Sequence, residues 1–316
     1  MFWSFLFRDS DIVSRGTEIK NKMVVIEKCP VCENAETELF VATKDFFLTK
    51  ENFNIVKCKT CSFVFTNPIP DKNILPAYYE SPDYISHTLK KCDIKSYIYH
   101  KIRKINIKNK FKIVNKYKNA GHILDVGCGT GELLKYFKDK GWKTAGIEPA
   151  EQARNFAVEN YQLDVFPESK IKQLGDLKFD VISMWHVLEH VYDLNDRLSL
   201  LKKILHQDGY MFIAVPNIDS FDASLYGKYW AALDVPRHLY HFNKRSLKKL
   251  IEKHSFELID VYPMKFDAYY VSLLSEAYKK SGILGYAKAI LNGFKSNYKA
   301  SRSGNYSSMI FVVRQK

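Results

Sequence analysis

The sequence predicts an α/β protein whose main domain is a mostly parallel sheet with helices on both faces, preceded by a small cysteine-rich unit. Three observations lead to this prediction. A short strand at 122–126 runs into a glycine-rich turn and then a helix, which forms a strand–helix unit. Further apolar strand patterns alternate with helical ones as far as 309–313. Two Cys-x-x-Cys pairs precede this region, at 29–32 and 58–61.

The composition is that of a folded chain. A length of 316 residues suffices for one large α/β core and a small satellite domain. A hydrophobic share of 46% argues against disorder, and the longest apolar runs are too short for a membrane span. Residues 1–22 lack the basic region and small-residue cleavage site of a signal peptide. We expect them to be a disordered leader on a cytoplasmic protein.

The net charge of +13 is concentrated in two stretches. Eleven Lys or Arg residues and one acid lie between Lys90 and Lys118, and eight basic residues and no acid lie from Ala277 onward. The first stretch also repeats isoleucine at helical spacing, at Ile94, Ile98, Ile102 and Ile105. It therefore predicts a basic helix. The lysines are either a solvated helix face or a surface for an anionic partner, which would be a phosphate-bearing substrate or a nucleic acid.

The paired Cys-x-x-Cys knuckles are separated by 25 residues and predict a tetrahedral Cys₄ zinc site. Its ligands would be Cys29, Cys32, Cys58 and Cys61. Apolar stretches between the knuckles, at 46–47 and 53–56, predict short strands. The unit at 23–70 thus resembles a zinc ribbon with a structural ion. Two disulfides would require an oxidising compartment, which nothing else in the sequence indicates.

The glycine-rich turn predicts a cofactor site. Its glycines permit close backbone approach to a ligand beside a helix N-terminus, and they stand at Gly127, Gly129 and Gly131. Glu132 occupies the position where a dinucleotide-binding fingerprint requires its last glycine, so a carboxylate would repel a pyrophosphate there. A cofactor without phosphates is favoured over NAD. Glu148 ends the next strand, where it can accept hydrogen bonds from ribose hydroxyls.

Residues 120–260 carry a family resemblance. The run from Ile123 to Gly131, together with Glu148, resembles the first two motifs of class I S-adenosylmethionine-dependent methyltransferases, and 179–191 resembles their fourth strand and the following segment. The resemblance implies a Rossmann-like seven-stranded sheet whose last strand runs antiparallel between the fifth and sixth. It also implies S-adenosylmethionine as cofactor. The predicted cofactor-binding residues are Asp125, Gly127, Cys128, Gly129, Gly131, Glu148, Met184, His186 and Tyr79.

Outside this common core, three segments have predicted roles. Residues 71–119 would form a helical linker that acts as a cofactor lid. The Rossmann-like domain would span 120–316, with insertions at 216–245 and 265–308. Insertions of this length are uncommon unless they are functional, so we expect the methyl acceptor between them.

Histidine is the best-suited general base near neutral pH, and several lie in these segments. The predicted catalytic residues are His190, His238 and His241, with Glu189 and Tyr240 as partners. A packing role is the alternative for each of them. Arg237 could bind a phosphate or carboxylate of the substrate through its planar fork. Residues 186–190 also match the H-x-x-E-H pattern of inverted zinc proteases, but they directly follow a strand, where the required continuous helix is not expected.

A Cys₄ unit ahead of this core is similar in architecture to sugar C-methyltransferases, which act on nucleotide-linked sugars. The similarity implies C- or O-methylation of an anionic small-molecule or glycan-precursor acceptor. An alternative is an RNA or protein methyltransferase whose zinc ribbon and basic surface hold a macromolecule. A third interpretation, a non-catalytic binding module, is disfavoured by the intact glycines and Glu148.

Overall fold

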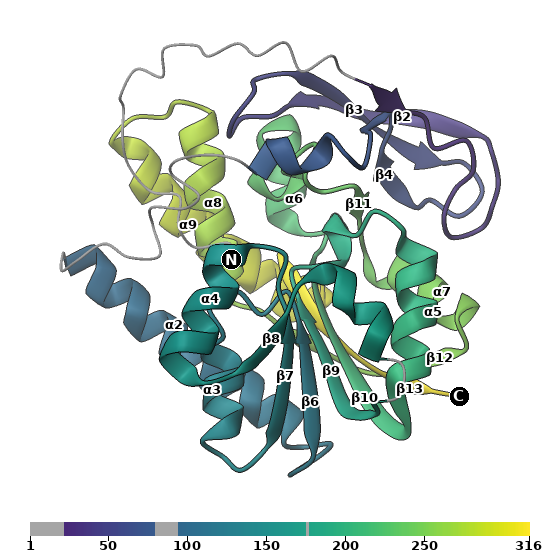
Figure 1. The fold of residues 1–316 in the computed structure, drawn as a ribbon. Helices are drawn as coiled ribbons and strands as arrows, with labels where there is room; N and C mark the ends of the chain where they lie inside the picture. Colours follow the sequence, from purple (N-terminus) through teal and green to yellow (C-terminus); the bar gives the residue numbers. More distant parts are fainter. Residues whose placement is uncertain (1–21, 80–93, 175–176) are drawn as a thin grey trace.

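The structure is a computed structural model that describes residues 22–79, 94–174 and 177–316 (Figure 1). Side chains of the first helical turns, at 94–100, are not described. The predicted leader at 1–22 therefore lies outside the described residues, apart from Lys22. Within the described part of the chain, no helix is both long and apolar enough to cross a lipid bilayer.

A seven-stranded mixed sheet forms the centre of the molecule, in the order β12-β13-β10-β9-β6-β7-β8. Strands β6 to β10 run parallel, and β13 is antiparallel to both β10 and β12, as the sequence predicts for the last strand. The strands are β6 (His122–Val126), β7 (Lys143–Ile147), β8 (Asp164–Phe166), β9 (Phe179–Trp185), β10 (Leu205–Pro216), β12 (Phe256–Pro263) and β13 (Ser308–Gln315).

Helices cover both faces of this sheet because its central strands are apolar on both sides. Ile123 packs into the cluster on one face and its neighbour Leu124 into the cluster on the other. The first face is covered by α2 (Ile94–Val114), α3 (Glu132–Lys138) and α4 (Glu151–Tyr161), and the second by α5 (Leu194–Ile204) and α7 (Lys244–Lys253). A 3₁₀ turn, η2 (Glu168–Leu174), follows β8.

Helix α2 confirms the predicted basic helix, and its predicted apolar face can be followed only in part. The side chains of Ile94 and Ile98 lie outside the described residues, Ile102 is half-buried and Ile105 is 40% exposed. The described side chains of α2 that pack against the sheet are Ile107, Phe111 and Val114. Ile105, the last member of the isoleucine repeat, is thus not one of the residues that α2 packs on the sheet.

The N-terminal unit is a small antiparallel sheet, which we call the N-terminal sheet. It contains β2 (Thr37–Lys44), β3 (Asn52–Cys58), β4 (Val64–Thr66) and β11 (Tyr240–His241), in the order β11-β4-β3-β2. Since β11 comes from the 216–245 segment, the cysteine-rich unit and the main domain share one sheet. A separate pair, β1 (Met23–Val24) and β5 (Ile69–Pro70), lies beside it.

The predicted strand at Phe46–Phe47 is wrong, because these residues form a turn. The Asp45 carboxylate accepts hydrogen bonds from the backbone N–H groups of Phe47, Leu48 and Thr49, at 2.9, 3.1 and 2.9 Å. Such a side-chain cap offers the backbone an alternative to strand pairing. It ends β2 before the two phenylalanines.

The two long insertions are both structured. The first contains α6 (Phe221–Tyr226), the 3₁₀ turns η4 (Gly227–Tyr229) and η5 (Ala231–Leu233), and β11. The second is a helical hairpin of α8 (Asp267–Tyr278) and α9 (Leu284–Ser303), as expected for a helical segment. Helix α8 follows the end of β12, so the hairpin stands at the carboxyl-end edge of the parallel strands (Figure 1). Ligands of doubly wound sheets bind at this edge.

Candidate active site

The glycine loop connects β6 to α3 and has left-handed backbone at Gly127, Gly129 and Gly131. A Cβ atom added at Gly129 would meet no described atom within 4 Å, so the loop surface is open there. A Cβ atom at Gly131 would lie 2.6 Å from Leu163 Cδ1 and 2.9 Å from Ala157 Cβ. Gly129 therefore faces space that a ligand can fill, whereas Gly131 is needed for packing of the loop against α4.

We expect Gly131→Ala to destabilise the protein by about 2 kcal/mol or more, since it adds overpacking to backbone strain. The matched control is Gly141→Ala, because Gly141 has φ +85° but open space around its Cα. In that control the substitution causes backbone strain without overpacking. Urea unfolding of both variants would measure the difference. Equal losses of stability would contradict the packing role of Gly131.

Two buried acids hold the loop in place. Glu148 is fully buried, and its carboxylate accepts the N–H groups of Gly129 at 2.8 Å and Ala150 at 2.9 Å. Burial raises the pKa of this carboxyl, while the two N–H groups oppose the rise. Asp125 accepts the Ser183 hydroxyl at 2.5 Å, and burial raises its pKa to about 6. Glu148 thus ties the loop to β7, and its predicted contact with ribose stays a prediction.

Helix α2 contacts the glycine loop and the first turn of α3, and its predicted role as a cofactor lid stays a prediction. Arg103 donates to the Thr130 hydroxyl at 3.2 Å and forms an ion pair with Glu132. Lys110 lies 4.3 Å from the centre of the Trp185 ring, and burial lowers its pKa to about 8. Sequence reasoning missed Lys110, because it treated the basic stretch as a whole and did not predict which lysine turns inward.

His186 follows β9 with a left-handed φ of 57°, and the 3₁₀ turn η3 (Leu188–His190) comes next. The continuous helix of the inverted zinc-protease motif is therefore absent at this described segment. His186 Nε2 lies 3.0 Å from Asp267 Oδ2, and Nδ1 lies 3.4 Å from Glu189 Oε1. Burial alone would lower the pKa of His186, but the two carboxylates outweigh it and raise the pKa to about 9. His186 is thus a cation at neutral pH.

The raised pKa of His186 predicts a pH dependence of stability. The charge contributes fully below the unfolded-state pKa near 6.5, and this stabilisation is lost as the pH rises through about 9. We expect His186→Gln to remove about 3 kcal/mol at pH 6 and little at pH 9.5. Urea unfolding of both proteins at the two pH values measures this. A loss that does not change with pH would contradict the ion pairing.

His190 and His238 lie together beside Glu189, with ring centres 4.5 Å apart. His190 Nδ1 lies 3.0 Å from the Arg237 carbonyl and 3.1 Å from the Tyr79 hydroxyl, and His238 Nδ1 lies 2.8 Å from the Ala232 carbonyl. Because a carbonyl can only accept, each ring carries its proton on Nδ1 and its basic lone pair on Nε2. Burial lowers the pKa of both rings, so both are neutral at pH 7.

Three predicted catalytic residues are therefore brought together. One ligand atom from each of Glu189, His190 and His238 lies within 4.8 Å of the others, a spacing that could also hold a metal ion. The segment that leads into this group contacts the glycine loop, since a Cβ atom on Gly127 would lie 2.5 Å from Val187 Cγ2. Val187 stands three residues before His190 in the chain, so the imidazole group follows directly on a residue that packs against the predicted cofactor loop.

Two other predicted catalytic residues belong to the N-terminal sheet. The Tyr240 hydroxyl donates to the Tyr192 carbonyl at 3.0 Å, and its ring packs against Phe63. Both contacts hold Tyr240 in a buried position, and its predicted role as a catalytic partner stays a prediction. His241 Nε2 lies 3.2 Å from the Thr66 hydroxyl, and burial lowers its pKa to about 3. This low pKa disfavours His241 as a general base at neutral pH, and its predicted catalytic role stays a prediction.

Arg237 is not available to a substrate, so its predicted role in binding a phosphate or carboxylate is wrong. The residue is 3% exposed, and its guanidinium lies 2.9 Å from Asp45 Oδ1 and 2.6 Å from Asp234 Oδ1. It also donates to the Tyr78 carbonyl at 3.1 Å. These contacts occupy the whole fork. Arg237 instead fastens the turn after β2 to the 216–245 insertion.

The remaining predicted cofactor residues, Met184, Tyr79 and Cys128, lie in different parts of the structure. Met184 is fully buried in the hydrophobic core near the end of β9, and its predicted cofactor contact stays a prediction. Tyr79 lies in η1 (Leu75–Tyr79) against His190, on the histidine side of the site. Cys128 is half-buried in the loop and turns toward Gly146, whose added Cβ would lie 2.7 Å from its sulfur. Asp267, which sequence reasoning missed, comes from the first turn of α8.

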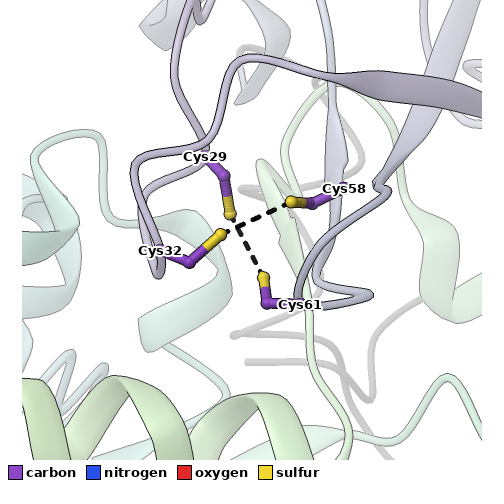
Figure 2. A group of neighbouring side chains, drawn as sticks. All are labelled: Cys29, Cys32, Cys58 and Cys61. Atoms are coloured by element: carbon purple, nitrogen blue, oxygen red, sulfur yellow. Dashed lines mark hydrogen bonds between the residues drawn. The ribbon is translucent and has the colours of Figure 1, made fainter.

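The four knuckle cysteines converge at one end of the N-terminal sheet, and Figure 2 shows their sulfur atoms pointing toward a common centre. Cys29 Sγ lies 3.5 Å from Cys61 Sγ, and Cys32 Sγ lies 3.5 Å from Cys58 Sγ. A tetrahedral zinc with bonds of about 2.3 Å separates its sulfurs by about 3.8 Å. Burial raises the pKa of the Cys61 thiol to about 11, so a cation is needed to keep it ionised at neutral pH.

A family model described as a methyltransferase domain matches residues 99–261, just over half of the chain. The chain belongs to this methyltransferase family. The matched region contains the glycine loop, His186 and the His190–His238 pair. The methyltransferase sheet thus carries both the predicted cofactor side and the predicted acceptor side of the site.

Two curated relatives each match less than half of this chain. The ubiquinone biosynthesis O-methyltransferase of Bartonella bacilliformis is 29% identical over 150 residues, which is 44% of this chain and 60% of that one. The enzyme of the same name from Pasteurella multocida is 32% identical over 111 residues, 30% of this chain and 46% of that one. This methyltransferase therefore spans 60% or less of the length of both relatives.

A solved structure supports the fold independently. Magnesium protoporphyrin IX methyltransferase from Synechocystis, crystallised with SAH, superposes with a TM-score of 0.52 at 13% identity. The match covers 78% of this methyltransferase and all of that chain. At this identity the likeness concerns the fold alone.

Proposed function

We propose that the protein transfers a methyl group from S-adenosylmethionine to an oxygen of a small molecule. The observation that carries this proposal is the pair of neutral imidazoles, His190 and His238, next to a segment whose Val187 packs against Gly127 of the glycine loop. Family membership and the O-methyltransferase names of the relatives support it. C-methylation, a nucleotide-linked sugar and an anionic acceptor remain open within this class, although Arg237 is not available to bind a phosphate.

The residues present fit the cofactor. Gly129 leaves open space at the loop surface, and Glu132 at the start of α3 disfavours a pyrophosphate. Asp125 and Glu148 are buried acids at the ends of the two strands beside the loop, and negative charge there would favour a cationic cofactor over a phosphate-bearing one. When bound, S-adenosylmethionine supplies an electrophilic methyl group. Gly127, Gly129 and Gly131 would hold it, with Arg103 and Lys110 of α2 closing over them.

His190 is the better general base of the pair, because its ring is less buried than that of His238. Its Nε2 would accept the proton of the acceptor hydroxyl while the oxygen attacks the methyl carbon. The Arg237 carbonyl and the Tyr79 hydroxyl fix the ring from the opposite side. The buried Glu189 carboxylate stabilises the imidazolium that results, and His186 keeps that carboxylate in place. His238, which is almost fully buried, would support the His190 ring from behind.

We further propose that the cysteine quartet holds a structural zinc ion. The converging sulfurs, their separations and the shared sheet support this assignment. All four ligand positions would be filled by protein, so the ion would contribute to folding and would take no part in methyl transfer.

Two measurements test the proposed function. Calorimetry should detect S-adenosylmethionine binding to the zinc-loaded protein. Mass spectrometry should then show the gain of one methyl group on phenols, catechols or nucleotide-linked sugars. A protein that binds no S-adenosylmethionine would refute the proposal. RNA binding that weakens steeply with salt, together with methylated RNA, would favour the macromolecular alternative.

The base is tested separately. We expect His190→Gln to lower kcat about 100-fold or more and to leave S-adenosylmethionine affinity unchanged. His254→Gln is the matched control, because His254 lies outside the site and bonds to Asn195. Equal activity of the two variants would contradict the role of His190.

A further inference from the structure

Helix α9 buries its small residues and exposes its large apolar ones, the reverse of a helix that packs on a protein core. Its buried positions are small: Gly285, Ala289, Gly293, Ser296 and Ala300. Its large apolar side chains face outward: Ile283 is 89% exposed, Leu284 71%, Ile290 58%, Leu291 58%, Phe294 60% and Tyr298 53%. We call these six residues the α9 outer face. They recur at helical spacing, so they form one stripe.

The small residues of α9 permit close packing and leave nothing large to bury inward. A Cβ atom on Gly293 would lie 2.9 Å from the backbone Cα of Tyr269 on α8. Helix α9 therefore packs against α8 through its small residues. Its large apolar side chains take no part in that packing. Exposing six of them costs free energy unless another surface covers the stripe.

The charges around the stripe indicate what covers it. The exposed basic residues of this segment are Lys279, Lys280, Lys288, Lys295, Lys299 and Arg302. None of them forms an ion pair with a residue that the structure describes, and the sequence has no acid after Glu276. Lys288, Lys295 and Lys299 follow one flank of the stripe at the same helical spacing. A second copy would bring the same positive charges against this flank, whereas an anionic lipid surface neutralises them.

We propose that the α9 outer face binds to the surface of an anionic phospholipid membrane, with its apolar side chains in the interfacial region and its lysines at the headgroups. The stripe is not continuous with the His190–His238 pair, so the inference goes beyond the proposed function. Because α8 carries Asp267 to His186, the same hairpin would hold the site close to the membrane.

Cosedimentation with vesicles tests the proposal. The protein should bind vesicles that contain phosphatidylglycerol and phosphatidylcholine, and bind phosphatidylcholine alone more weakly. We expect the triple variant I290S/L291S/F294S to partition to vesicles about tenfold or more weakly than the wild type. The variant K288E/K295E should partition more weakly to the anionic vesicles only. The matched charge control is K140E/K143E, on exposed residues at the opposite edge of the sheet, which should bind as the wild type does.

Three results would overturn the proposal: no vesicle binding by the wild type, equal binding by the triple variant, or a dimer in sedimentation velocity that the triple variant abolishes. Calorimetry with S-adenosylmethionine serves as the test of folding in each variant, because no α9 residue belongs to the site. If the triple variant does not fold, K288E/K295E still decides the outcome. Wild-type vesicle binding without cofactor binding would refute the proposed function alone.

Discussion

Cys58→Ser is expected to abolish zinc binding and to unfold the N-terminal sheet. A serine hydroxyl is not ionised at neutral pH and cannot replace the buried Cys58 thiolate. Structural zinc contributes about 10–16 kcal/mol of apparent binding free energy, which exceeds the stability of most small domains. Zinc content by plasma mass spectrometry should fall from one ion per chain to nearly none. Hydrogen exchange should then lose protection in β2, β3 and β4.

The matched control for this substitution is Cys128→Ser. Cys128 lies in the glycine loop, outside the quartet, and should leave the zinc content unchanged. Chelation of the wild-type protein should reproduce the unfolding seen with Cys58→Ser. A fully folded N-terminal sheet after zinc removal would contradict the structural role of the ion.

Arg237→Ala is expected to destabilise the protein by about 3–5 kcal/mol. The substitution leaves the carboxylates of Asp45 and Asp234 without the cation that compensates their burial, and it removes the donor to the Tyr78 carbonyl. Arg237 holds the pKa of Asp45 below its usual range against the effect of burial. Chemical denaturation followed by tryptophan fluorescence measures the loss.

Arg314→Ala is the control, because the Arg314–Glu257 pair is exposed and should contribute little. Arg237→Lys should recover only part of the stability, since a point charge cannot satisfy two carboxylates and a carbonyl at once. A stability of Arg237→Ala close to that of Arg314→Ala would show that the ion pairs of Arg237 with Asp45 and Asp234 do not stabilise the protein.

Local features were the predictable part of this molecule. Short sequence patterns predicted the strand at 122–126, the glycine turn after it and the cysteine quartet. The interactions that produce these features act between residues close together in the sequence. The strand order was predicted from the family resemblance, and the register of β13 between β10 and β12 bears it out. Apolar periodicity alone carries no information on which strands become neighbours.

The contacts between distant segments were not predictable. The density of His, Arg and aromatic residues at 230–242 suggested one acceptor site, yet it serves two purposes. His238 belongs to the site, whereas Arg237 and Tyr240 join the two sheets. A polar residue that binds a substrate and one that joins distant segments look the same in the sequence. The fold decides between them by where it places partners such as Asp45 and Tyr192. The approach of Asp267 to His186 was hidden for the same reason.

The pairing of β11 with β4 limits how the protein can be divided. Tyr240 and His241 form backbone hydrogen bonds across to Phe65 and Val64. A catalytic fragment that begins after Pro70 would leave β11 as an unpaired edge and would uncover the aromatic rings behind it, a combination that favours aggregation. The cysteine-rich unit is therefore not an interchangeable module that can be grafted or deleted. Expressed fragments and chimaeras with related enzymes should retain both strands from the same parent.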